Sequence, residues 1–233
     1  MDYPISLIAV PRAVRLVSTA RLRDPILYLL LDDPSLADLS RDALVKLAAD
    51  LAEIEGGTSA RLQAQSLFTN VFPGGRPHAN FVNAAFAYWR PRERNRFNDD
   101  SLGAWYAAFE TQTSLSEVIF HIGRELERVQ DWNAVIEWSE MWASFAGSYV
   151  DLRTVVPRPD CLHLDSETGY AAGNMLARKT RDAGHNGIIY PSVRNQGGTC
   201  LVALWPHAVQ SVAHGAIIRT AWRGSRVPVI EAL

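Results

Sequence analysis

The sequence lacks the features that would tie it to a membrane or a secreted framework. Its two cysteines, Cys161 and Cys200, form no CxxC pair, which argues against a zinc site and a disulfide scaffold. The longest strongly apolar run, Ile26 to Leu31, is far too short to span a bilayer. The apolar stretch from Ile5 to Val10 has no basic leader before it. We therefore expect a cytoplasmic protein with two buried thiols and no membrane partner.

The sequence also lacks an excess of charge of either sign. It has 23 basic and 25 acidic residues, giving a formal net charge of −2. A protein that binds DNA or RNA directly through phosphates is usually strongly basic, so we expect no direct nucleic-acid partner. Glycine-rich loops of the Walker or Rossmann type, HExxH and GxSxG do not occur either. These enzyme classes therefore have no support.

The first third of the chain has the spacing of helices. Ser40 suits an N-cap, apolar residues then recur at helical spacing, and Gly56 with Gly57 gives a C-terminal stop. This pattern predicts helix within Asp24 to Gly57, and a second short helix covers Ser59 to Leu67. We expect a helical lobe at about residues 24–67.

The rest of the sequence predicts strands around two helices. An amphipathic stripe predicts a helix from Thr113 to Val129, and a second helix runs from about Ser166 to Ala183. Runs rich in β-branched and aromatic residues between turn signals predict the strands. These runs are Val14–Thr19, Ala104–Phe109, Trp138–Leu152, Cys161–Asp165, Gly187–Val193, Thr199–Trp205, Val209–His214 and Ala216–Trp222.

This order of elements differs from the regular strand–helix alternation of a doubly wound parallel sheet. Helices come first, a mixed region follows, and strands dominate the second half. The sequence therefore predicts an α+β fold with a mixed, largely antiparallel sheet. No repeat or linker is evident, so residues 1–233 are expected to form one domain.

Two candidate binding residues lie before the amphipathic helix. Arg96, between Asn95 and Asn98, offers a planar donor fork suited to phosphate, although a solvated surface arginine would have the same local sequence. Tyr106 alternates with Trp105, so one of the two faces the core and the other can line a cleft. Simple packing of a strand tyrosine is the alternative.

The other candidates are a carboxylate and a polar loop. Glu117 follows Ser114 with the spacing of a capping box, which needs no function, but it can equally direct a carboxylate at a ligand. Ser192 and Asn195 follow a buried strand, where hydroxyl, amide and backbone N–H groups can hold a ribose or phosphate. Serine and asparagine are also ordinary turn formers.

Taken together, these segments resemble the RES domain family, toxins of bacterial toxin–antitoxin pairs named for an arginine, a glutamate and a serine. The resemblance spans roughly Val14 to Pro206 and depends on order and spacing as well as identity. Many members have Gly-Gly directly before the motif arginine, where this chain has Arg94-Asn95. The matching segments are Asn95–Asn98, Ala104–Ala108, Leu115–Val118, Tyr190–Asn195 and Gly197-Gly198.

The resemblance implies a fold similar to ADP-ribosyltransferases of the diphtheria-toxin type and an activity that consumes NAD as substrate, with no resident cofactor or metal. It implies that Glu117 stabilises an oxocarbenium-like centre, Arg96 holds the pyrophosphate and Tyr106 stacks on nicotinamide. Ser192 and Asn195 would orient the ribose. Family members often open with an aromatic–arginine pair; in this chain Val14 precedes Arg15, which would be a second arginine of the site. Which of the two, Arg15 or Arg96, holds the pyrophosphate stays open.

The resemblance also implies a partner, an Xre-type antitoxin with a helix-turn-helix domain that blocks the NAD cleft and makes the DNA contact. Two other functions stay open: a nucleotide- or partner-binding protein without turnover, in which Glu117 is only a cap, and a ribonuclease-type toxin. The acceptor of ADP-ribose and the formation of a homo-oligomer also stay open.

Overall fold

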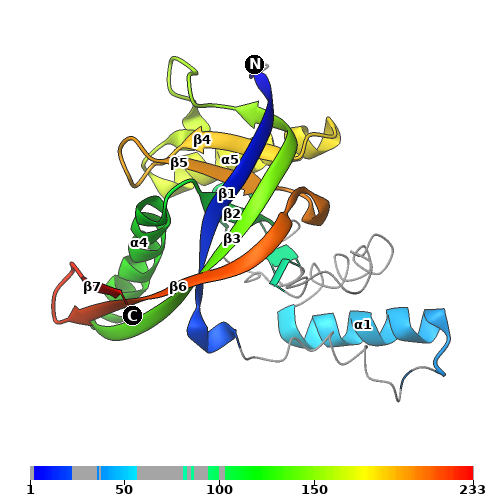
Figure 1. The fold of residues 1–233 in the computed structure, drawn as a ribbon, viewed down its shortest axis with the longest axis horizontal. Coiled ribbons are helices and arrows are strands. Elements are labelled where there is room, and N and C mark those ends of the chain that lie inside the picture. Colours follow the sequence, from blue (N-terminus) through cyan, green and yellow to red (C-terminus); the bar gives the residue numbers. More distant parts are fainter. Residues whose placement is uncertain are drawn as a thin grey trace.

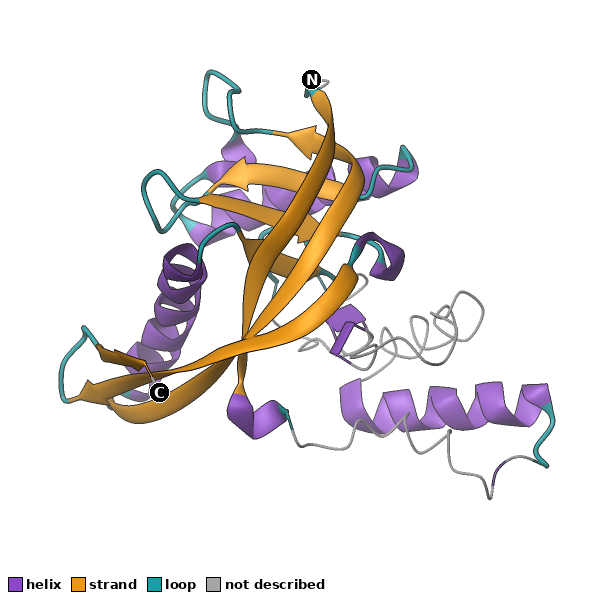
Figure 2. Cartoon of the chain, in the orientation of Figure 1, coloured by secondary structure: helices purple, strands orange, loops and turns teal. Residues whose placement is uncertain are grey.

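The computed structural model describes residues 3–22, 36, 38–56, 81–82, 85–86, 94–99 and 103–232. A strongly curved sheet of seven strands forms its centre, and two helices, α4 and α5, flank it (Figures 1 and 2). The strands are β1 (Ile5–Ser18), β2 (Trp105–Ala108), β3 (Asn133–Asp151), β4 (Gly187–Pro191), β5 (Thr199–Ala203), β6 (Gln210–Arg223) and β7 (Val229–Ala232). The α-helices are α1 (Arg41–Gly56), α4 (Thr111–Val129) and α5 (Ser166–Asp182), and short 3-10 helices cover Thr19–Arg21, Asp160–Leu162 and Pro206–Ala208.

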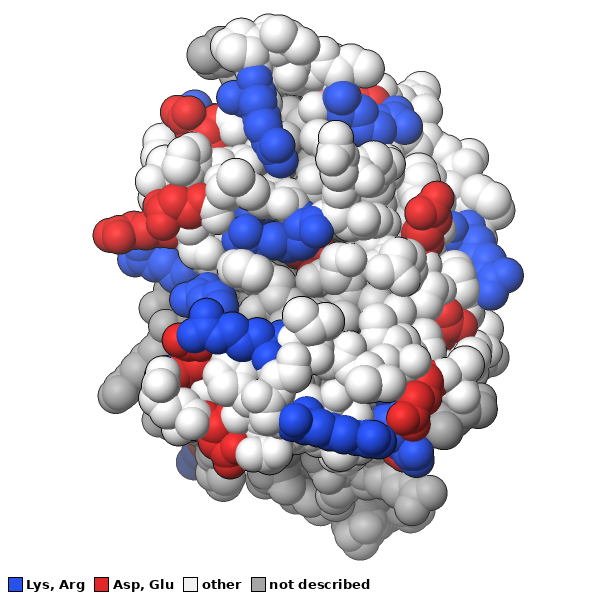
Figure 3. All heavy atoms as spheres, turned by 90° about the vertical axis from the view of Figure 1, so that its left-hand side faces the viewer, with Lys and Arg blue, Asp and Glu red and all other residues white. Residues whose placement is uncertain are grey.

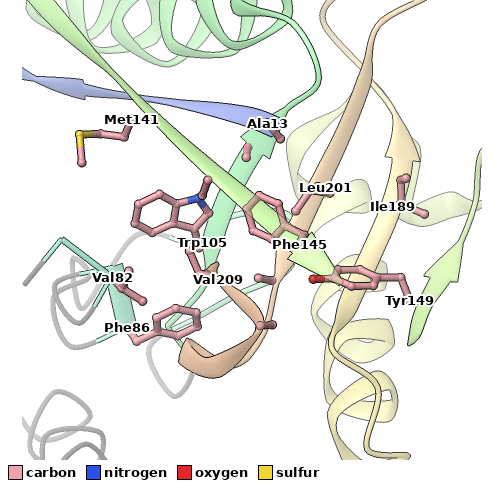
Figure 4. Close-up of a cluster of buried hydrophobic side chains, with 14 residues drawn as sticks. Ala13, Val82, Phe86, Trp105, Met141, Phe145, Tyr149, Ile189, Leu201 and Val209 are labelled. Carbon is pink, nitrogen blue, oxygen red and sulfur yellow. The ribbon is translucent and has the colours of Figure 1, made fainter. Parts of the chain in front are cut away.

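The sheet is mixed and largely antiparallel, as the sequence predicts. Its order is β1-β2-β5-β4-β3-β6-β7, and of these neighbours only β3 and β4 run parallel. β1 also pairs with β3 over most of its length, so β1, β2, β5, β4 and β3 form a closed circuit. Large side chains that share one face of these strands make the main core (Figure 4). They include Trp105, Met141, Phe145, Tyr149, Ile189 and Leu201.

The two flanking helices cover different parts of the sheet. Ala177 of α5 belongs to the hydrophobic cluster on the opposite face of β2, β4 and β5, which includes Ile188 and Val202. Leu115 of α4 packs with Val14 and other residues of β1, β3 and β6. Because side chains alternate along a strand, Trp105 enters the main core while Tyr106 points to the α5 side, where it packs against the second hydrophobic cluster.

Several predicted elements need new boundaries, and one is wrong. β1 and β3 are longer than expected, and the two strands predicted around Gly215 form the single strand β6. The strand predicted over Cys161–Asp165 is absent, because Asp160–Leu162 is a 3-10 helix. The carbonyls of Cys161 and His163 turn towards the Arg96 side chain instead of a strand partner.

The predicted helical lobe is described only in part. α1 occupies Arg41–Gly56, and the Ser40 hydroxyl accepts from the Ala43 N–H at 3.3 Å, which confirms the cap. Gly57 of the predicted glycine stop lies outside the described residues. Residues 23–35 and 57–80, including the helix expected over Ser59–Leu67, lie outside the described residues. Within the described segments, every helix is too short or too polar to cross a membrane.

Candidate functional site

The loop between β4 and β5, residues 192–198, is folded by its own backbone, and we name it the serine loop. The Ser192 N–H donates to the Gly198 carbonyl at 2.8 Å. The Ser192 hydroxyl oxygen accepts from the N–H groups of Arg194, at 3.1 Å, and Asn195, at 3.0 Å. Gly197 has φ +85°, a conformation that suits glycine. These bonds fix the direction of the Ser192 hydroxyl.

The serine loop contacts one stripe of α4, formed by residues at i, i+4 and i+7. Such positions lie on the same face of a helix. The Asn195 amide donates to the Thr113 hydroxyl at 2.8 Å, the Ser192 hydroxyl donates to Glu117 Oε1 at 2.8 Å, and the Arg194 guanidinium carbon lies 3.4 Å from the centre of the Phe120 ring. Asn195 therefore fastens the loop to the helix.

Glu117 is not a capping residue. α4 begins at Thr111, and the Ser114 hydroxyl donates to the Val14 carbonyl at 2.7 Å instead of capping the helix. The half-buried Glu117 carboxylate accepts from Ser192, and the Cys200 sulfur lies 3.9 Å from the same Oε1 atom. The capping-box interpretation is therefore wrong, and the carboxylate is held in place from the end of β4.

Arg96 is buried, with 8% of its surface exposed, so it is not a solvated surface arginine. Its Nη1 donates to the carbonyls of Cys161, at 2.6 Å, and His163, at 3.1 Å. The guanidinium carbon lies 5.3 Å from the centre of the Tyr170 ring. Much of its donor capacity is thus used inside the protein.

Two glycines of α5 make room for Arg96. A Cβ on Gly173 would lie 1.9 Å from the Arg96 carbonyl oxygen, and one on Gly169 would lie 2.6 Å from Arg96 Nη1. The Asn174 amide also donates to the Asn95 carbonyl at 2.8 Å. The four-residue spacing of these glycines in the sequence was a usable signal for a close approach to this helix.

Tyr106 holds the segment around Arg96 through its hydroxyl. The hydroxyl accepts from the Phe97 N–H at 2.8 Å and donates to Asn98 Oδ1 at 2.8 Å. Burial raises the pKa of Tyr106 well above its ordinary value. The phenol is therefore a neutral donor, and stacking of its ring on nicotinamide stays a prediction.

Arg15 lies near Tyr106, not on the serine loop. Its guanidinium carbon is 5.0 Å from the centre of the Trp105 ring. Burial raises the pKa of Tyr106 and is the dominant effect. The positive charge of Arg15 is one of the contributions that lower this pKa. The structure thus places Arg15 on β1 next to Trp105, and its part in the site stays a prediction.

The predicted arginine, glutamate and serine share one electrostatic neighbourhood. Burial lowers the pKa of Arg194, the charge of Arg96 lowers it further, and Glu117 opposes both. Burial likewise raises the pKa of Tyr190, with further contributions from Cys200 and Glu117. Ser192 and Glu117 therefore lie in direct contact, while Arg96 is linked to them only through its charge acting on Arg194.

A cavity of about 530 Å³ opens beside the serine loop. Among the described residues, no cluster of three or more His, Cys, Asp or Glu side chains is positioned to hold a metal. The cavity is lined by Arg158, Pro191, Ser192, Val193, Arg194, Gln196 and Gly197. Sequence reasoning missed Arg158 and Arg194, for which charge in a loop was the only signal.

Comparisons with known proteins place this architecture in a family. Among solved structures, the Mycobacterium tuberculosis MbcT–MbcA toxin–antitoxin complex gives a match with 12% identity and a TM-score of 0.34, covering 52% of this chain and 71% of that one. No curated protein matches the chain. The family model described as the RES domain matches residues 73–223, more than half of the sequence, and the chain belongs to the RES domain family.

Proposed function

We propose that this protein is the toxin of a toxin–antitoxin pair and that it cleaves the bond between nicotinamide and ribose in NAD. The main support is the Glu117 carboxylate, which accepts from Ser192 at 2.8 Å, and Ser192 lines a polar cavity. Family membership supports the toxin role and the action on NAD. The likeness to ADP-ribosyltransferase folds is part of the same proposal.

For this reaction the protein mainly has to place a negative charge close to the ribose. When the glycosidic C–N bond breaks, its electron pair leaves with nicotinamide, which becomes neutral, so no general acid is needed. Positive charge develops on the ribose, and a nearby carboxylate lowers the barrier. Water, phosphate or a protein side chain then bonds to the ribose carbon and releases a proton.

The contacts of Glu117 suit this role. Ser192 and Cys200 both lie against Oε1. Oε2 is then the oxygen that accepts from the ribose 2′-hydroxyl and brings negative charge close to the oxocarbenium centre. Ser192 acts as a positioning residue for Glu117, while the ring of Tyr106 stacks on nicotinamide.

The proposed partner is an Xre-type antitoxin whose C-terminal part closes the NAD cleft and whose helix-turn-helix domain binds DNA. A toxin with a net charge close to zero suits this arrangement, because the partner then makes the contact with DNA. Such a pair would act in the cytoplasm.

Nicotinamide release from NAD tests the proposal. Glu117→Gln should lower the rate by about 10²–10⁴-fold, because it removes the charge that stabilises the transition state. Glu125→Gln is the matched control: it lies on the same helix, is paired with Arg128 and should keep full activity. Equal release by wild type and Glu117→Gln would reject the catalytic role.

The other functions give different results in the same assay. Degradation of RNA with NAD untouched would identify a ribonuclease-type toxin. Binding of NAD without nicotinamide release would identify a non-catalytic protein. Mass spectrometry of the products with and without phosphate then distinguishes hydrolysis, phosphorolysis and protein modification.

A further inference from the structure

The cavity beside the serine loop is lined by two arginines from different parts of the chain. Arg194 belongs to the serine loop, and Arg158 precedes the 3-10 helix at Asp160–Leu162. We propose that Arg158 and Arg194 form the anion-binding pair that holds the pyrophosphate of the dinucleotide. This inference rests on the proposed function and assigns a part of the substrate to residues outside the predicted set.

Arg194 is positioned before any ligand arrives. The face of its guanidinium stacks on the Phe120 ring at 3.4 Å, and Nη2 donates to the Leu164 carbonyl at 3.1 Å. An arginine side chain has five N–H donors in a planar fork, so most of the fork remains for phosphate oxygens. Because the guanidinium plane and the Nη2 donor of Arg194 are already held in place, binding an anion here loses little side-chain entropy.

Arg158 supplies a second, exposed charge. Its side chain is exposed, and within the described part of the chain its guanidinium has no hydrogen bond or ion pair. A pyrophosphate carries two negative charges and several acceptor oxygens, which suits two arginines on different walls of a cavity. A volume of about 530 Å³ also lies within the ordinary range of about 300–1,000 Å³ for ligand sites.

Arg96 is less suited to this task. Its Nη1 is bound to two backbone carbonyls, α5 lies directly against it, and it does not line the cavity.

Figure 3 views the side of the molecule on which α4 lies. Lys and Arg side chains cross the middle of that face, while most Asp and Glu side chains lie nearer its margins, so an approaching anion meets positive charge.

Calorimetric binding of ADP tests the pair directly. Arg158→Gln and Arg194→Gln should each weaken binding of ADP by about tenfold to a hundredfold, the usual loss for a charge-assisted hydrogen bond. Arg128→Gln removes the same charge from an exposed position on α4 and should bind ADP as wild type does. Adenosine lacks the pyrophosphate, so any binding of adenosine should be equal in all four proteins.

A kinetic measurement separates the substrate's pyrophosphate from free phosphate. Both variants should raise the KM for NAD about tenfold or more with little change in kcat. With nicotinamide riboside, which has the same scissile bond but no pyrophosphate, they should match wild type. A loss that appears equally with the riboside and depends on added phosphate would overturn the proposal in favour of an acceptor site.

The outcomes also separate this proposal from the proposed function. Equal ADP affinity in all four proteins, or no ADP binding by wild type, overturns the arginine pair even if NAD is cleaved. Arginine-dependent ADP binding without nicotinamide release upholds the pair and rejects the NAD-cleaving activity.

Discussion

The segment that carries Arg96 and the serine loop differ in what their side chains contact. Around Arg96, the side chains bond to other parts of the protein: Arg96 to backbone carbonyls and Tyr106 to Phe97 and Asn98. On the serine loop, Ser192 and Arg194 contact α4 and also line the cavity. The first segment is enclosed, and the second faces the cavity.

Residues grouped by one family pattern therefore need not share one task. A buried arginine with two carbonyl partners mainly determines where neighbouring elements lie, because breaking its contacts would leave polar groups unsatisfied. A loop fixed by its own hydrogen bonds can instead present side chains with little loss of entropy. We therefore expect changes around Arg96 to lower stability most, and changes on the serine loop to lower activity most.

Gly173→Ala should give the largest effect. Its Cβ would lie 1.9 Å from the Arg96 carbonyl oxygen, which is backbone, so α5 and the Arg96 segment must separate. We expect the free energy of unfolding to fall by about 2–4 kcal/mol, measured by urea denaturation.

Gly123→Ala on α4 is the matched control. Its Cβ would meet only the Trp132 ring, at 3.9 Å, an ordinary contact. Alanine favours helix over glycine, so this variant should gain about 0.5–1 kcal/mol. Destabilisation of both variants to the same extent would mean that the contact with Arg96 does not require Gly173.

Ser192→Ala should act on turnover instead of folding. Without the hydroxyl, Glu117 Oε1 loses its bond at 2.8 Å and the carboxylate becomes less well placed. We expect kcat for nicotinamide release to fall about 10- to 100-fold, with the KM for NAD changed less than about twofold.

Ser116→Ala provides the comparison, because among the described residues its hydroxyl bonds only to the Gln112 carbonyl on the surface of the same helix. It should leave both constants unchanged. A rise in KM without a fall in kcat for Ser192→Ala would assign Ser192 to ribose binding instead of positioning Glu117.

Tyr106→Phe should have the opposite profile. It removes the hydroxyl between Phe97 and Asn98 but keeps the ring, so we expect unfolding to become easier by about 1–2 kcal/mol with kcat changed only a few-fold. Tyr149→Phe is the control, since the buried Tyr149 hydroxyl has no hydrogen-bond partner within the part of the chain described. A large loss of kcat in Tyr106→Phe at unchanged stability would place its hydroxyl in the chemistry.

The sequence predicted the mixed sheet and grouped Arg96, Glu117 and Ser192, because alternation and motif order survive in a single sequence. It misjudged Cys161–Asp165, where a β-like composition yields to carbonyls that bind Arg96. Sequence spacing alone could not separate a cap at Glu117 from a ligand-facing carboxylate, because that depends on where α4 begins. It also missed Arg158, whose cavity exists only once the loops before α5 and after β4 come together.

Acid unfolding should show the smallest effect, at the base of the loop that carries Arg158. Hydrogen bonds from the Arg153 side chain hold the pKa of Asp151 at about 2, and Ser6 also donates to it. Because the pKa of Asp151 is lowered in the folded protein, this carboxylate stabilises the fold at pH values above the ordinary pKa of an aspartate. That stabilisation is lost as the pH falls towards 2. Because the Arg153 side chain is 40% exposed and screened by water, the contribution to the free energy of unfolding is about 1 kcal/mol.

Asp151→Asn and Arg153→Gln should each flatten the fall in stability between pH 4 and pH 2, as measured by urea denaturation at each pH. Parallel curves for wild type and both variants would show that this pair does not stabilise the loop that presents Arg158.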